Sequence, residues 1–279
     1  MIYQRIFGRT APRGEKRTHD EMYYVHRDTA KLHLQNSRKE TYTLTTPEGL
    51  RLKGFYYPAG EEPSGKIAFI VHGYRSTGAE AAGVFQKIYH DRGFDIFAPD
   101  NPASGESEGD FISFGYYEGE AVLMWLQYLL IRFGEDVEIV LHGFSLGGGT
   151  VLSVSDRIPP QVKFIIDDCG IAGAESCLRD RLGGMYPVLN GMVLLKHDFR
   201  FSLGMSDAIP HLKKARCPVL FVHGTEDRTV PLKTTQELAR ICPTYHETFF
   251  VPGAGHVESV HRNRRSYEEK IDRFLEFFS

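Results

Sequence analysis

The sequence lacks several features that would assign the protein to a specialised class. None of its apolar runs approaches the roughly 20 residues that a membrane-spanning helix needs. Its first stretch, MIYQRIFGRTAPRGEKRTHDE, has no apolar core of the kind found in secretory signals. The formal net charge of −3 gives no sign of a nucleic-acid partner, and the basic cluster Arg262, Arg264 and Arg265 is typical of a solvated helix face. We therefore expect no membrane span and no nucleic-acid ligand.

Cysteine is also scarce, with four in 279 residues and no C-x-x-C spacing: Cys169, Cys177, Cys217 and Cys242. A chain of this length can bury a substantial core without disulfides. The pattern is typical of free thiols in a reducing compartment. Together with the missing secretory signal, it predicts a cytoplasmic protein.

What the sequence does contain is an alternation of short apolar strands with helices. Strands are expected at 41–45, 50–57, 67–71, 94–98, 137–141, 162–166, 217–222 and 248–251. Helices are expected at 78–92, 116–133, after residue 145, at 232–241 and at the C-terminal end, the one at 116–133 well buried because it is apolar nearly all round. The alternation predicts an α/β fold with a doubly wound, mostly parallel sheet of about eight strands and an antiparallel hairpin at its edge.

The chain divides into an N-terminal extension and one domain. Residues 1–39 are polar with little periodicity, apart from a possible helix at 23–34, and we expect them to pack on the domain formed by 40–279. Residues 171–206 interrupt the alternation after a strand and are expected to form a short lid insertion over the ligand crevice. An apolar cluster before it either lines an acyl pocket or packs in the core: Phe111, Phe114, Tyr116 and Tyr117.

The central motif is VEIVLHGFSLGGGT at residues 137–150, in which Gly143-x-Ser145-x-Gly147 stands between a strand and a helix. A serine on so sharp a turn adopts a strained backbone, and glycine at both flanking positions avoids a steric clash. The N–H groups of the following helix point toward charge that develops at the serine. This context favours an exposed nucleophile over an ordinary Gly-rich turn.

A serine hydroxyl is a weak nucleophile and needs a base that is held by a carboxylate. Asp227 follows the strand at 217–222, and His256 lies on the Gly-rich turn after the last strand. Both loops are at the sheet edge that carries Ser145. The order and placement predict that Ser145 is the nucleophile, Asp227 the acid and His256 the base.

Each partner of the serine has rivals in the sequence. Glu226 is the nearest alternative acid, and Asp167 and Asp168 end an earlier strand. The alternative bases, His246 and His261, lie before the last strand and beyond the turn, where they are less well placed.

The oxyanion of an acyl-transfer transition state also needs donors. The backbone N–H of Leu146 is one candidate, and that of Tyr74, in the loop after the strand at 67–71, is the other. His72 in the same loop is expected to bond neighbouring backbone. His72, His142 and His223 each precede a glycine at a strand end, but no H-x-H or H-x-x-H spacing supports a metal site. We expect no metal and no cofactor.

With these residues in place, the sequence resembles the α/β-hydrolase superfamily, and within it bacterial serine esterases of the serine-aminopeptidase or lysophospholipase-like kind. The matching segments are IVHGY at 70–74, APDNPASGESEG at 98–109, LHGFSLGGG at 141–149, VHGTEDRTVP at 222–231 and PGAGH at 252–256. The resemblance implies the same roles for Ser145, Asp227, His256, Tyr74 and Leu146. One segment departs from it, since residues 101–107 lack the usual Arg-Gly or His-Gly before Gly-x-Ser, which leaves the substrate contacts there open.

The sequence therefore predicts a serine hydrolase that cleaves a small-molecule carboxylic ester through an acyl-enzyme. The same residues could instead cleave an amide, as an aminopeptidase does, or transfer the acyl group to another acceptor. A hydrolase scaffold can also serve as a non-catalytic binding module. Oligomeric state and natural substrate are left open.

Overall fold

The computed structural model describes residues 2–9, 34, 37–198 and 200–279. Eight strands form one sheet in the order β1-β2-β4-β3-β5-β6-β7-β8. The pairs β1–β2 and β2–β4 are antiparallel, whereas all the others are parallel. The prediction of a mostly parallel sheet with an antiparallel hairpin at its edge is confirmed. The strands are β1 Glu40–Thr45, β2 Arg51–Tyr57, β3 Lys66–Val71, β4 Asp95–Pro99, β5 Glu138–Phe144, β6 Val162–Asp168, β7 Val219–Gly224 and β8 His246–Val251.

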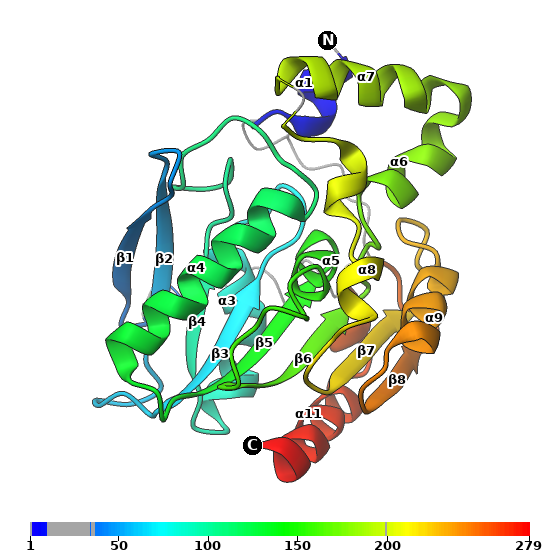
Figure 1. Cartoon of the computed structure of the whole chain (residues 1–279). Coiled ribbons are helices and arrows are strands. Elements are labelled where there is room, and N and C mark those ends of the chain that lie inside the picture. The colour runs from blue at the N-terminus through cyan, green and yellow to red at the C-terminus, as the bar shows by residue number, and fades with distance from the viewer. Residues whose placement is uncertain (1, 10–33, 35–36, 199) are drawn as a thin grey trace.

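Helices cover both faces of this sheet, as Figure 1 shows. Because successive strand residues point to opposite faces, Phe69 and Leu141 enter one core while Ile70 and Val140 enter the other. The first core is closed by α4 Tyr116–Phe133, α5 Leu146–Leu152, α8 Ile209–Leu212 and α9 Leu232–Ile241. The second is closed by α3 Gly78–His90, α10 Ser259–Arg262 and α11 Arg264–Phe278.

Helix α4 corrects one expectation. It buries a single face, which includes Trp125 and Leu129, whereas Ile131 is 79% exposed. The core covers only this face of the helix, so an apolar residue on the other side stays exposed.

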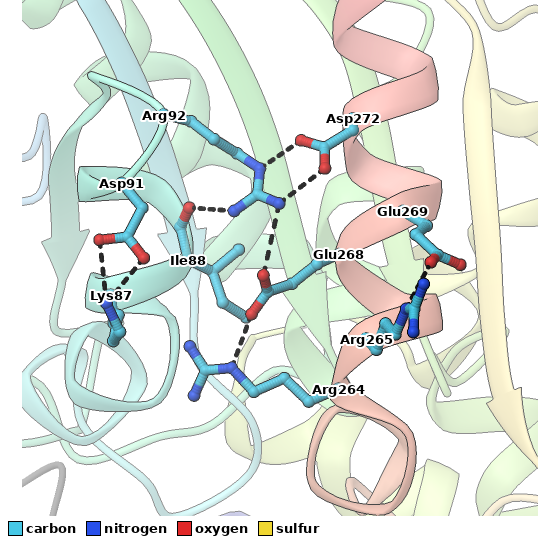
Figure 2. A network of polar contacts seen from close by, with 9 residues as sticks. All are labelled: Lys87, Ile88, Asp91, Arg92, Arg264, Arg265, Glu268, Glu269 and Asp272. Atoms are coloured by element: carbon cyan, nitrogen blue, oxygen red, sulfur yellow. Dashed lines mark hydrogen bonds and ion pairs between the residues drawn. The ribbon is translucent and has the colours of Figure 1, made fainter.

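Figure 2 shows polar contacts between the start of α11 and the end of α3, in which Arg264 of the basic cluster is linked to Arg92 through Glu268. Arg264 and Arg265 each pair with the glutamate one helical turn later. Arg92, just after α3, bridges to Asp272 at 2.8 Å and to Glu268 at 3.4 Å. The half-buried Arg92 therefore ties α11 to α3, while the exposed pairs contribute little stability.

Residues 171–206 lie above the carboxyl ends of the parallel strands; we keep the name lid for this segment, and its covering role stays a prediction. It consists of α6 Ala174–Leu182, η1 Gly183–Met185, α7 Tyr186–Lys196 and η2 Leu203–Ser206. The short N-terminal helix α1, Ile2–Phe7, lies beside α7 at the same end of the molecule (Figure 1). The helix expected at 23–34 falls outside the described residues, except for Leu34. No helix among the described residues is long and apolar enough to cross a membrane.

Candidate active site

Ser145 occupies a sharp turn between β5 and α5. Its backbone has φ 55° and ψ −119°, a conformation that costs a non-glycine residue about 1–3 kcal/mol. The glycines around it allow this turn. A Cβ on Gly143 would lie 2.1 Å from the Gly147 carbonyl oxygen, and one on Gly147 would lie 2.0 Å from that of Val71. Any larger residue at either position would push the turn out of place.

The side chains of Ser145, His256 and Asp227 form one line of hydrogen bonds. His256 Nε2 lies 2.8 Å from Ser145 Oγ, and His256 Nδ1 lies 2.7 Å from Asp227 Oδ2. Asp227 Oδ2 can only accept, so Nδ1 carries the proton and Nε2 is free to accept the serine proton. The three residues come from the loops after β5, β7 and β8, which brings sequence-distant groups to one edge of the sheet.

Asp227 is held on all sides as the ionised acid. Its Oδ1 accepts the backbone N–H groups of Thr229 at 2.7 Å and Val230 at 2.9 Å. Burial alone would raise the pKa of Asp227, but the hydrogen bonds from His223 and His256 outweigh it and hold the pKa below the usual value.

His223 is a contact that the sequence did not reveal. Its Nε2 lies 3.4 Å from Asp227 Oδ2 and 3.0 Å from the Val230 carbonyl oxygen. Its Nδ1 meets the Thr235 hydroxyl at 2.6 Å. Burial opposes its charge, but the bonds to Asp227 and Val230 raise the pKa of His223 overall. The spacing of four residues before Asp227 was the available signal, yet a strand-end histidine has many other uses.

The rival groups occupy other surroundings. Glu226 is exposed, and His246 Nδ1 bonds the Thr244 carbonyl oxygen. Asp168 accepts a hydrogen bond of 2.9 Å from the Tyr267 hydroxyl, and Asp167 is fully buried. Burial raises the pKa of Asp167 to about 7 and that of Asp168 to about 6. Neither carboxylate is hydrogen-bonded to His256 in the described structure.

The loop after β3 packs directly on the serine. A Cβ on Gly73 would lie 3.3 Å from Ser145 Cβ. Tyr74, Ser145 and Leu146 line one cavity. The two candidate oxyanion residues thus flank the serine, and the donor role of their N–H groups stays a prediction.

His72 shapes this loop as expected. Its Nδ1–H donates to the Gly73 carbonyl oxygen at 2.8 Å, and its Nε2 accepts the Asn101 N–H at 3.0 Å. Burial lowers the pKa of His72 to about 4, so the ring is neutral at pH 7. It links the loop after β3 to the segment 101–107, where the sequence departs from its relatives.

That departing segment is built around Asp100. Its carboxylate accepts the N–H groups of Gly78 at 2.7 Å and Glu106 at 2.6 Å. The Ser107 hydroxyl donates to the Asp100 carbonyl oxygen and accepts from the Lys53 N–H. In the described structure the segment therefore supports the loops beside the site.

The cavity at Ser145 has a volume of about 170 Å³. Its walls include Ile171 and Leu178 from the lid and, unexpectedly, Arg5 and Ile6 from α1. The Tyr74 hydroxyl donates to the Ile6 carbonyl oxygen at 2.7 Å, and the Arg75 guanidinium donates to that of Arg5 at 2.6 Å. Because the N-terminal residues are polar and without a clear period, the sequence carried no signal for this wall.

Aromatic rings hold α1 in this position. Tyr3 and Phe7 pack against Phe111, with ring centroids 5.9 and 5.4 Å apart, and Phe7 also contacts Phe114. Of the apolar cluster left open by the sequence, Phe114 lines the cavity and Phe111 packs beneath it.

The three strand-end histidines lie in separate hydrogen-bonded environments, with His142 between the hydroxyls of Tyr89 and Tyr267.

One trio of possible metal donors does lie close together in the described chain: Cys169, Asp227 and His256, with ligand atoms within 4.8 Å of one another. Asp227 and His256 already bond each other. Burial raises the pKa of the Cys169 thiol well above its usual value, which disfavours the thiolate that a metal would need. The trio fits a metal poorly.

Comparison with known proteins places this architecture. No known protein-family model matches the chain. An uncharacterised protein of Bacillus subtilis, YqkD, is 23% identical over 249 residues, covering 87% of this chain and 81% of its own. Among solved structures, the Pyrococcus furiosus esterase Pf2001 has a TM-score of 0.69 at 18% identity, covering 88% and 95% of the two chains. The α/β hydrolase GrgF from Penicillium has 0.66 at 14% identity, covering 86% and 98%. The chain has the α/β-hydrolase fold.

Another solved structure with a similar fold is described as a peptidase. A Mycobacterium tuberculosis puromycin-hydrolyzing peptidase has a TM-score of 0.65 at 17% identity, covering 86% of this chain and 40% of its own. Identities this low support the fold, and the chemistry has to be argued from the site itself.

Proposed function

We propose that the protein is a serine hydrolase that cleaves carboxylic esters through an acyl-enzyme. The observation that carries the proposal is the line of hydrogen bonds from Ser145 Oγ through His256 to Asp227, beneath a strained serine backbone. A strained residue is retained where its position is used. Because Asp227 is ionised and accepts from His256 Nδ1, His256 Nε2 is the atom that can take the proton of the Ser145 hydroxyl.

In the proposed reaction, Ser145 Oγ attacks the ester carbonyl carbon while His256 Nε2 takes the hydroxyl proton. Asp227 keeps the other ring nitrogen protonated and stabilises the imidazolium. The N–H groups of Leu146 and Tyr74 receive the negative oxygen. The C–O bond then breaks and His256 returns its proton to the leaving alcohol. Water repeats the sequence to release the acid.

Ester cleavage is the first candidate because an ester carbonyl is less stabilised by resonance than an amide carbonyl, and an alkoxide leaves more readily than an amide anion. The second candidate is amide cleavage, since an α/β-hydrolase neighbour is a peptidase. An acyl acceptor other than water would give a transferase from the same steps. Within this proposal the domain comprises residues 40–279 with the lid at 171–206, and the N-terminal extension supplies α1 as a wall of the site.

The test compares wild type with Ser145→Ala on a short p-nitrophenyl ester and on the matched anilide. We expect kcat for the ester to fall by at least about 10⁴-fold in the variant, with an unchanged fold. A fluorophosphonate should label the wild type only. An unreactive serine combined with tight ligand binding would support a non-catalytic module instead, and faster anilide cleavage would favour the amidase.

A further inference from the structure

A second, larger hollow opens beside the serine cavity. It has a volume of about 650 Å³ and lies among the start of the lid, α8, α9 and the loop after β7. Four residues line both spaces: Ile171, Cys177, Thr229 and Val230. The two spaces therefore lie next to each other on either side of these four residues, and we call the second space the groove. Figure 1 shows α8 and α9 on the same side of the sheet, below the lid.

Both apolar and basic side chains line the groove. Ile209, Leu238 and Ile241 contribute apolar surface. Four basic side chains line the groove against a single acidic one, Glu237: Lys213, Arg228, Lys233 and Arg240. The whole chain has 33 basic and 36 acidic residues. The groove therefore reverses the charge balance of the protein.

Only part of this positive charge is compensated by carboxylates. Lys233 pairs with Glu237 at 3.4 Å. Burial raises the pKa of the Asp207 carboxyl, and nearby Lys213 offsets a small part of that rise. Among the described residues, no carboxylate forms an ion pair with Arg228 or Arg240. Thr234 lines the same walls, and its hydroxyl can donate a hydrogen bond to an anion, whereas the Ser176 hydroxyl donates to the Gly173 carbonyl oxygen at 3.1 Å.

We propose that the groove binds the anionic end of the ester substrate, a carboxylate or a phosphate carried on an apolar body. The inference rests on the proposed serine hydrolase, and it adds the charge of the substrate and the place where that charge lies. Charges around a cleft raise the local concentration of an oppositely charged ligand and orient it. In this proposal the ester extends from the groove past the four shared residues and brings its carbonyl to Ser145.

The experiment uses p-nitrophenyl esters of one acyl chain whose far end is a methyl group, a carboxylate or a phosphate monoester, over a range of chain lengths. At low ionic strength, we expect wild type to have a lower KM for at least one anionic ester than for the neutral one. The variant Lys213→Gln/Arg240→Gln should raise that KM about 3- to 10-fold and leave the neutral ester within about twofold. Added salt should reduce the difference.

The matched control is Lys214→Gln/Arg216→Gln, which removes two exposed charges from the neighbouring segment that do not line the groove. It should leave all three esters unchanged. Preference for the neutral ester at every length, or equal effects of the two double variants, would overturn the groove assignment while leaving the hydrolase intact. Failure of wild type to cleave any of the esters would overturn the proposed function and this inference with it. The KM values of the carboxylate ester and of the phosphate ester show which of the two anions the groove binds better.

Discussion

Replacing Asp167 by Asn distinguishes a buried structural acid from the acid of the site. Asp167 is the second-last residue of β6, and its carboxyl packs against the backbones of Gly148 and Gly170 and is fully buried. Neither oxygen makes a well-formed hydrogen bond within the described chain, although the Gly170 N–H is near enough to lower the pKa slightly. Burial dominates and raises the pKa from 3.8 to about 7. Asn has the shape of the protonated acid and cannot ionise.

The sign of the effect on stability follows from proton binding. Between about pH 4 and pH 7 the folded state holds the Asp167 proton and the unfolded state releases it, so stability falls as the pH rises. A shift of roughly three units at about 1.36 kcal/mol each gives a cost on the order of 4 kcal/mol above pH 7. Asp167→Asn should therefore match wild type near pH 4 and gain stability over it toward pH 8. The pKa of Asp168 is also raised, so part of the fall in stability with rising pH remains in both proteins.

Urea unfolding at a series of pH values measures this difference, and ester hydrolysis is followed in parallel. We expect kcat/KM of Asp167→Asn to stay within about threefold of wild type, because His256 bonds Asp227 and not Asp167. A variant less stable than wild type at pH 8 would mean that Asp167 is ionised and paired in the fold, with His223 the nearest candidate. Lost hydrolysis would mean that Asp227 is the wrong acid.

Three further changes test the rest of the site. Asp227→Asn should lower kcat by about 10³- to 10⁴-fold in the ester assay, because the imidazole loses the acceptor that fixes its tautomer; near-wild-type turnover would exclude Asp227. Gly147→Ala should lower the free energy of unfolding by about 1–3 kcal/mol or more in urea titration, because its Cβ would meet the Val71 carbonyl. The control Gly184→Ala should be neutral, because a Cβ there meets nothing within 4 Å. Ile6→Ala should widen the serine cavity and shift the acyl-length profile toward longer esters; an unchanged profile would show that α1 does not bound the substrate.

The approximate positions of the strands along the chain and of the sharp turn could be predicted because they depend on local signals. Alternating apolar runs define the strands, and Gly143 and Gly147 mark a turn where a side chain cannot fit. Asp227 and His256 could be nominated because the loops that follow parallel strands all emerge at one edge. Their contact with each other and with Ser145 remained a prediction until the coordinates placed the atoms within 2.8 Å.

What the sequence could not predict depends on contacts between distant segments with no shared period. Arg5 and Ile6 reach the serine cavity because Tyr74 and Arg75 bond the backbone of α1, and a backbone acceptor has no sequence signature. His223 supports Asp227 through a contact that a strand-end histidine does not announce.

The charge of the groove could not be predicted either, because it also depends on distant segments. For the same reason the residues of the lid alone did not indicate the substrate. The basic residues within the lid are offset by acids, so its own composition favours no charge. Lys213, Arg228 and Arg240 come from three segments outside the lid, and each is ordinary in its own stretch. They become a single electrostatic feature only when β7 and its flanking helices bring them to one wall. On this proposal, the positive charge that recognises the substrate comes from residues around β7, while residues of the segment 171–206 and of α1 line the space at Ser145.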